Sequence, residues 1–210
     1  MKGKSMVIVK KWATGRIVTD LTESIEVKKR ILKDEALLSR IEDAAAAMID
    51  ALRVGNKIIF CGNGGSAADA QHLTAELVGR FMKERDALPA ITLTANTSIL
   101  TAIGNDYGYH QVFSRQLKAL ATKGDVLVGI STSGNSENVI QAVKEAKRIG
   151  LVTIGLLGCD GGKMGVKTRT LNFVDIPIIV PSNQTCRIQE AHIAIGHILC
   201  GLVEKYLFPE

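Results

Sequence analysis

The stretch DVLVGISTSGNSENVIQAVKEAKRI, residues 125–149, contains a strand pattern, a polar loop and a helix pattern in direct succession. After Asp125 the residues up to Ile130 are apolar or glycine, which is typical of a strand covered on both faces of a sheet. Over residues 136–149 the apolar side chains recur at helical spacing. A strand that runs at once into a helix predicts a parallel sheet with helices packed on it.

The same alternation continues through the chain beyond residue 55. Further strands, each a short apolar run, are expected at residues 57–61, 90–93, 152–157 and 171–180. Further helices, each with helical apolar spacing, are expected at residues 66–81, 98–103, 112–121 and 185–207. This order predicts an α/β fold, a three-layer sandwich in which helices flank both faces of a parallel sheet. Ligands of such folds collect beyond the carboxyl ends of the strands.

The chain before residue 55 has a helical pattern. Apolar side chains recur at helical spacing over residues 22–33 and again over 36–52. We expect two antiparallel helices, a helical hairpin joined near Asp34 and Glu35. The hairpin would bury its apolar stripes against itself, the main domain or another subunit, and plain packing explains the stripes without a further role.

Residues 1–17 lack such periodicity, so we expect them to form a loose N-terminal lead-in. The remaining residues, 18–210, are then a single domain that begins with the helical hairpin at 18–55. A chain of 210 residues suits one α/β domain with a short helical appendage.

Composition narrows the class of partner. Aromatic residues make up 4% of the chain, which argues against nucleic-acid binding by base stacking. The net charge of +5 comes from scattered Lys and Arg, and a mildly basic surface suits an anionic substrate. The chain has no run of about 18 apolar residues, so no membrane span is expected. Four cysteines without a CxxC pair are best interpreted as reduced thiols of a cytoplasmic protein.

The loop GISTSGNS, residues 129–136, joins the central strand to its helix. It combines the hydroxyls of Ser131, Thr132, Ser133 and Ser136 with a helix N-terminus, and these are the components of an anion cradle. Ser136 also suits the N-cap of the helix. The alternative is an ordinary capped turn with extra serines. The loop lacks the Gly-Lys-Thr/Ser ending of a Walker A loop, so it predicts a small phosphorylated ligand.

A second glycine-rich loop, CGNGGS at residues 61–66, repeats the strand–turn–helix arrangement. Its glycines allow the backbone to approach a ligand closely. Asn63 and Ser66 supply neutral hydrogen-bonding groups that suit sugar hydroxyls. A plain tight turn is the alternative interpretation.

His72 and Glu76 lie four residues apart on the helix that follows this loop, so both side chains lie on one face. Such a pair serves as metal ligands or as an acid–base pair, and the alternative is a surface hydrogen bond. The last helix adds Gln189, His192 and His197, although His192 could equally be an exposed helix residue.

Gln189 and His197 are two helical turns apart, about 12 Å at ~1.5 Å per residue. One ion could hardly bind both from a straight helix. We therefore expect either a bent helix or a site that a neighbouring subunit completes, and we favour the second arrangement as a hypothesis.

Four motifs in this order resemble the signatures of the phosphoheptose isomerase (sedoheptulose 7-phosphate isomerase) family, part of the wider sugar isomerase (SIS) domain group. They are CGNGGSAADAQH at 61–72, LTAIGNDYG at 100–108, GISTSGNS at 129–136 and RIQEAH at 187–192. The resemblance covers roughly residues 20–207. It implies a five-stranded parallel sheet and a homotetramer with active sites near subunit interfaces. The implied reaction converts D-sedoheptulose 7-phosphate to D-glycero-D-manno-heptose 7-phosphate through an enediol, the first step toward nucleotide-activated heptose for bacterial surface polysaccharide.

The resemblance also implies residue roles. The family's zinc ligands, one ion per subunit, fall on His72, Glu76, Gln189 and His197. Glu76 and His197 would carry the acid–base chemistry. The family's substrate contacts fall on Asn63, Gly64, Gly65, Asn105, Asp106, Ser131, Thr132, Ser133, Ser136 and Gln189. Arg80 matches a basic position near the family's active site. Two positions depart from the pattern, since Asn96 and Cys186 stand where many or some members have Asp.

Two other functions share this fold. The DnaA initiator-associating protein is a non-catalytic relative that works through protein contacts, and it lacks the full His/Glu/His set. Finding His72, Glu76 and His197 together therefore favours an enzyme. A different sugar-phosphate isomerase, for instance one that uses arabinose 5-phosphate, is disfavoured by the RIQE motif at 187–190.

Overall fold

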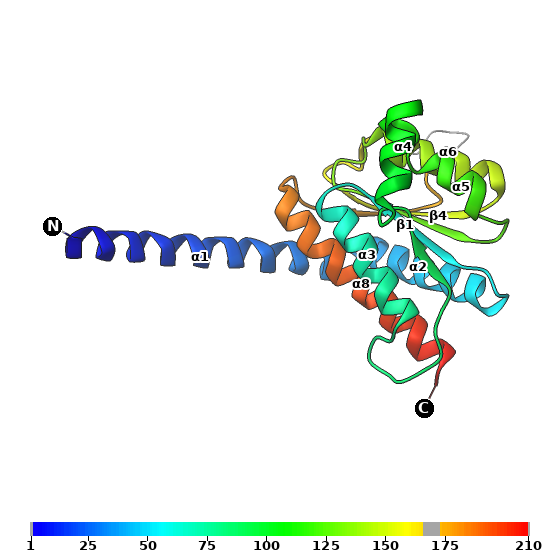
Figure 1. The fold of residues 1–210 in the computed structure, drawn as a ribbon. Coiled ribbons are helices and arrows are strands. Elements are labelled where there is room, and N and C mark those ends of the chain that lie inside the picture. The colour runs from blue at the N-terminus through cyan, green and yellow to red at the C-terminus, as the bar shows by residue number, and fades with distance from the viewer. Residues whose placement is uncertain (1, 166–172, 210) are drawn as a thin grey trace.

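The computed structural model describes residues 2–165 and 173–209, and its centre is a five-stranded sheet (Figure 1). The strands are β1 (Ile58–Gly62), β2 (Ala90–Thr92), β3 (Val126–Ser131), β4 (Val152–Gly158) and β5 (Ile176–Val180). All neighbours pair in parallel, in the order β2-β1-β3-β4-β5. The expected parallel sheet of five strands is confirmed.

The strand order reverses between β1 and β3, because the chain goes from β1 to the edge strand β2 and then returns to the other side of β1. The loops that follow β1 and β3 therefore leave neighbouring strand ends in different directions. Such a switch point leaves a crevice beyond the carboxyl ends of the strands. Both glycine-rich loops start there.

Helices cover both faces of the sheet, as expected for the three-layer sandwich (Figure 1). They are α1 (Lys2–Lys33), α2 (Glu35–Arg53), α3 (Gly65–Val78), α4 (Thr97–Tyr107), the 3-10 turn η1 (Tyr109–Gln111), α5 (Ser114–Leu120), α6 (Glu137–Ile149), α7 (Gly162–Gly165) and α8 (Thr185–Leu207). Phe60 and Val128 face the core beneath α2, α3 and α8, whereas Ile59 and Leu127 face the core beneath α4, α5 and α6. Alternate strand residues thus fill two separate cores.

The N-terminal region differs from the expected hairpin. α1 runs from Lys2 to Lys33, so residues 2–17 continue the helix although they lack apolar periodicity. Only Asp34 separates it from α2, and its carboxylate accepts a 3.0 Å hydrogen bond from the backbone N–H of Leu37 as an N-cap. One residue is too few to reverse the chain, and α2 continues past the end of α1 instead of folding back along it (Figure 1). A domain boundary near residue 17 stays a prediction.

The last strand is shorter than expected. Residues 171 and 172 of the expected strand lie outside the described residues, and β5 begins only at Ile176. Just before it, the Asp175 carboxylate accepts hydrogen bonds from the backbone N–H (2.9 Å) and the hydroxyl (2.7 Å) of Thr153. The side chain of Asp175 takes the β4 donor that another strand residue would have used, so pairing starts one residue later.

Within the described ranges, no helix is long and apolar enough to cross a membrane.

Candidate active site

The serine-rich loop lies between the end of β3 at Ser131 and the start of α6 at Glu137. The hydroxyls of Ser131 and Ser136 form a 3.0 Å hydrogen bond across the mouth of the loop. Ser136 occupies the N-cap position as expected, but its hydroxyl contacts Ser131 and does not cap the helix. The expected side-chain cap is therefore wrong. Without a side-chain cap from Ser136, the positive end of the α6 dipole lies at the end of the loop, where an anion would be stabilised.

The turn after β4, residues 159–164, packs against this loop, a contact that the sequence analysis did not predict. Gly134 has a left-handed φ of 63°, and the space that a Cβ would need is taken by the carbonyl group of Gly161. The Gly134 carbonyl accepts a 3.1 Å hydrogen bond from the N–H of Met164. The Asn135 side chain accepts another, at 3.0 Å, from the N–H of Lys163. The turn after β4 thus forms a floor for the serine-rich loop.

The two glycine-rich loops are joined by an amide pair. Asn63 donates to Oδ1 of Asn138 at 2.9 Å, and Asn138 donates back to Oδ1 of Asn63 at 2.8 Å. Asn138 is buried in the first turn of α6, and its Oδ1 also accepts from the N–H of Val139. The position of Asn63 is therefore set by the first turn of α6, the helix that follows the serine-rich loop.

The side chains of His72, Glu76 and His197 meet where α3, the helix that follows the CGNGGS loop, packs on α8. Nε2 of His72 lies 3.0 Å from Nε2 of His197 and 3.1 Å from Oε1 of Glu76. One ligand atom from each residue lies within 4.8 Å of the others. Two imidazoles and one carboxylate, with the His72 side chain half exposed, match the donor set of zinc sites that keep open positions. The residues present fit a metal ion.

This cluster bears on the hypothesis that a neighbouring subunit completes the site, which stays a prediction for Gln189. His72 on α3 and His197 on α8 are 125 residues apart in the chain, but the two helices pack against each other within one molecule. These two ligands therefore need no neighbouring subunit. Gln189 lies two turns earlier on α8, and its amide occupies the space that a Cβ would need at Gly65, the first residue of α3. Whether Gln189 completes the ligand set stays a proposal.

His192 does not belong to the cluster and is not exposed. Its side chain is fully buried, and Nε2 donates a 2.8 Å hydrogen bond to the carbonyl of Leu157. Burial lowers the pKa of His192 to about 4, so the ring is neutral at ordinary pH. His192 joins α8 to β4 and has a structural role.

Asp69 is a carboxylate that sequence analysis missed. It lies one turn before His72 on α3, and its Oδ2 is buried without a hydrogen-bond partner among the described residues. Burial raises the pKa of Asp69, while the nearby His72 and His197 oppose the shift. The proximity of Asp69 to His72 could have been predicted from the sequence, because their i, i+3 spacing places both side chains on one face of a helix.

The remaining expected site residues lie farther out. Asn105 and Asp106 are exposed in the last turn of α4, where the Asn105 amide donates to Asp106 at 2.8 Å. Among the described residues, no hydrogen bond or ion pair joins them to either loop or to the His/Glu cluster. Arg80 is exposed beyond α3. Asn96 is the N-cap of α4 and accepts from the N–H of Ile99 at 3.0 Å, a role that Asp would fill equally well.

Known proteins share this fold and sequence. A family model described as SIS domain matches residues 21–158. A phosphoheptose isomerase of Clostridium acetobutylicum is 54% identical over 194 residues, which cover 92% of this chain and 96% of that protein. One of Nitratiruptor sp. is 60% identical over 171 residues, 81% and 88% of the two chains. The chain belongs to the phosphoheptose isomerase family.

Solved structures of phosphoheptose isomerases have the same architecture over nearly their whole length. The protein from Neisseria gonorrhoeae has a TM-score of 0.83 at 47% identity, over 91% of this chain and 98% of that one. The protein from Francisella tularensis has a TM-score of 0.85 at 39% identity, over 92% and 98%. Membership of the phosphoheptose isomerases makes this protein an isomerase, and the expectation of an enzyme is confirmed.

Proposed function

We propose that the protein interconverts D-sedoheptulose 7-phosphate and D-glycero-D-manno-heptose 7-phosphate, the first step toward nucleotide-activated heptose for bacterial surface polysaccharide. The observation that carries this proposal is the meeting of His72, Glu76 and His197 between α3, the helix that follows the CGNGGS loop, and α8. The site combines an anion cradle with groups able to move protons, which is what an aldose–ketose isomerase of sugar phosphates requires. Membership of the phosphoheptose isomerase family supports a heptose phosphate as the substrate.

The phosphate would bind at the serine-rich loop. The hydroxyls there and the amino end of α6 supply donors and a favourable dipole. The sugar hydroxyls would contact Asn63 and the backbone at Gly64 and Gly65. The full proposed set of substrate contacts is Asn63, Gly64, Gly65, Asn105, Asp106, Ser131, Thr132, Ser133, Ser136 and Gln189. Binding the phosphate far from the reacting carbons orients the sugar for reaction.

The metal in this proposal is zinc, one ion per subunit, held by His72, Glu76, His197 and Gln189. When bound, it would polarise the substrate's oxygens as a Lewis acid. The donor set of two imidazoles and a carboxylate supports zinc.

Glu76 and His197 would share the acid–base work. One proton leaves C1 and one is added to the oxygen on C2, which gives an enediol. A proton returned to C2 and a proton lost from the oxygen on C1 then leave the aldehyde at C1. Glu76 on α3 and His197 on α8 both lie within the cluster around His72, so the proposed acid and base groups are close to each other.

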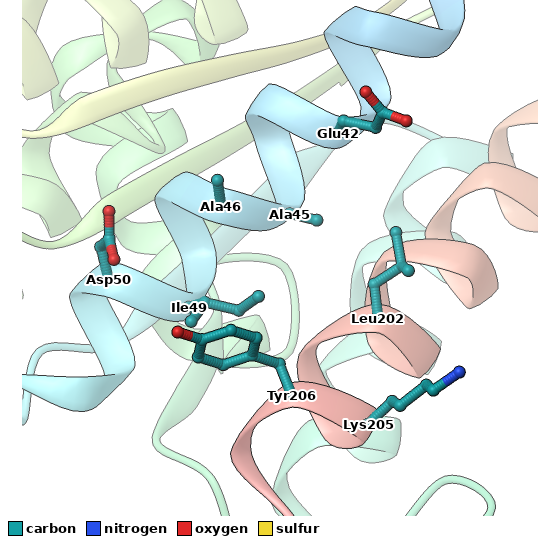
Figure 2. Close-up of a pocket in the computed structure, with 8 residues that line it drawn as sticks. All are labelled: Glu42, Ala45, Ala46, Ile49, Asp50, Leu202, Lys205 and Tyr206. Atoms are coloured by element: carbon teal, nitrogen blue, oxygen red, sulfur yellow. The ribbon is translucent and has the colours of Figure 1, made fainter. Parts of the chain in front are cut away.

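We also propose the homotetramer, with active sites near subunit interfaces. α1 projects from the body (Figure 1), and Val18, Leu21, Ile25 and Leu32 are more than half exposed along it at spacings of three, four and seven residues. An apolar groove of about 600 Å³ between α2 and α8 offers a matching surface, with Ile49 and Tyr206 side by side on its floor (Figure 2). Such exposed apolar surface is typical of an interface.

Charge also favours a second copy of the chain in this groove. Among the described residues, Glu42 and Asp50 line it with a single cation, Lys205, whereas α1 has nine Lys and Arg against three Asp and Glu. We place the protein in the cytoplasm, because its proposed substrate is a charged sugar phosphate.

Conversion of sedoheptulose 7-phosphate in deuterated water tests the reaction. Proton transfer through an exchanging base predicts an aldose product with deuterium at C2. Absence of product would contradict the proposed substrate, and product without deuterium would contradict the acid–base route.

A further inference from the structure

The segment after α3, residues 80–86, is tied to α8 by one buried carboxylate. Glu204 accepts hydrogen bonds from the backbone N–H groups of Phe81 (3.1 Å), Met82 (2.8 Å) and Lys83 (2.9 Å). It also forms an ion pair with Arg85 at 3.1 Å. The two charged side chains are only 3% and 1% exposed. Burying an ion pair is costly unless further hydrogen bonds satisfy it, and here they do.

Arg85 ties the same segment to the end of α3. Its guanidinium donates to the backbone carbonyls of Glu76 and Leu77, both at 2.8 Å, and to that of Gly79 at 3.4 Å. The last carbonyls of a helix have no partners within it, so Arg85 satisfies them from outside. The helix turn that carries Glu76 is therefore joined through Arg85 and Glu204 to α8, the helix that carries His197.

This arrangement places the Phe81 ring on His197. The two rings are stacked with centroids 5.6 Å apart and planes 28° apart. The Phe81 ring also lies over Gly201, one turn beyond His197, where an added Cβ would be 3.4 Å from its Cε1. His197 also meets His72, whose ring is tilted by 58° to it. The imidazole of His197 thus contacts both the Phe81 ring and the His72 ring.

We propose that Phe81, held in place by the Arg85–Glu204 ion pair, is a positioning residue that sets the ring orientation of His197. This inference rests on the proposed metal role of His197. A ligand ring that is already oriented loses less freedom when it binds an ion, and loss of such outer contacts typically costs 10–100-fold in metal affinity. The Phe81 side chain forms no hydrogen bond, so we expect the loss of zinc affinity to be near the lower end of this range, about tenfold.

The variant Phe81→Leu tests the proposal, because leucine keeps an apolar side chain and removes the ring. We expect about tenfold weaker zinc binding, measured by competition with a chromophoric chelator. The KM for the sugar phosphate should stay unchanged, because the phosphate loop is on other elements, while kcat falls. The variant Phe81→Tyr keeps the aromatic ring and should bind zinc with the affinity of the wild type. Phe208→Leu is the matched control, since Phe208 packs against the same core and lies 5.7 Å from the Arg85 guanidinium.

A second measurement needs no metal. In the metal-free protein the Hε1 signal of His197, assigned by substitution, should lose its ring-current shift and move downfield in Phe81→Leu but stay in place in Phe208→Leu. An unmoved His197 signal, or equal zinc affinity in the wild type and Phe81→Leu, would overturn the inference. If the wild type bound no zinc, the proposed metal would fail, and the His197 signal would still decide the role of Phe81. Glu204→Gln should reproduce the shift change of Phe81→Leu.

Discussion

Asn138 and Asn63 exchange two amide hydrogen bonds, of 2.8 and 2.9 Å, across the point where the sheet reverses its strand order. The pair connects the loop proposed to bind phosphate with the loop proposed to bind the sugar. Because Asn138 is buried, its partner is held by a side chain that water cannot easily replace. The relative position of the two halves of the substrate site therefore depends on one amide.

Replacing Asn138 with alanine should weaken substrate binding. The change leaves the Asn63 amide without its partner and costs about 1–3 kcal/mol in stability. The KM for the sugar phosphate is expected to rise more than kcat falls, since the loops bind and do not carry out the chemistry. Steady-state kinetics checks this. Gln141→Ala, a partly exposed position one turn further along α6, is the control and should behave as wild type.

Gly134→Ala should destabilise the protein more than Gly55→Ala. Both glycines have left-handed φ values, 63° and 82°, so each alanine costs about 1–2 kcal/mol of backbone strain. At Gly55 the added Cβ meets nothing within 4 Å, whereas at Gly134 it meets the carbonyl of Gly161. Crowding should add about 1–3 kcal/mol at Gly134. Thermal unfolding of the two variants at equal protein concentration measures the difference, and equal shifts would contradict the described packing of the β4 turn.

His192 should make stability fall as the pH drops below about 6.5. Its pKa is about 4 in the folded protein against an ordinary value of 6.5, so the unfolded chain binds the additional proton between these values. The stabilisation is fully present above pH 6.5 and is lost toward pH 4, by about 3 kcal/mol in all.

The variant His192→Gln keeps a donor for the Leu157 carbonyl and removes the titration. Its unfolding free energy should be flatter than that of the wild type between pH 6.5 and 4.5. The carboxylates of Asp125, Asp175 and Glu204 have lowered pKa values, so their stabilisation is lost mainly below this window and is lost equally in the wild type and the variant. Equal slopes in the wild type and the variant would show that His192 does not titrate as described.

Mixing His72→Ala chains with His197→Ala chains should restore no activity. The two imidazoles meet within a single chain, so every subunit in such a mixture lacks one of them. Activity is measured after co-refolding, with each variant alone as control. Recovery toward a quarter or more of the wild-type rate would mean that the ligands come from different subunits.

Local patterns in the sequence predicted the strands, most helices and both loops, because each depends on neighbouring residues. The 185–207 helix has the same bounds in the structure. The interpretation of α1 failed because residues 2–17 have no apolar stripe, and their helix continues the pattern that begins near residue 22. β5 begins at Ile176, directly after Asp175, whose carboxylate bonds Thr153, 22 residues away in the chain, a contact that no local pattern contains.

The site was only partly predictable for the same reason. His72 and Glu76 share a helix face, so their proximity could be derived from spacing alone. His197 joins them only through the packing of α3 on α8, which no local pattern contains. His192 and His197 look equivalent in the sequence, yet one is buried against Leu157 and the other faces His72. The role of Phe81 depends on Glu204, more than 120 residues away.

Turnover of sedoheptulose 7-phosphate by the purified protein tests the central claim most directly. The rate would be measured as isolated, after chelation, and after zinc is restored, with Glu76→Gln treated identically. We expect formation of heptose 7-phosphate that chelation removes and zinc restores, and a loss of at least about 100-fold in Glu76→Gln. No turnover by folded, zinc-loaded protein, or full activity in Glu76→Gln, would contradict the assignment of the reaction to this site.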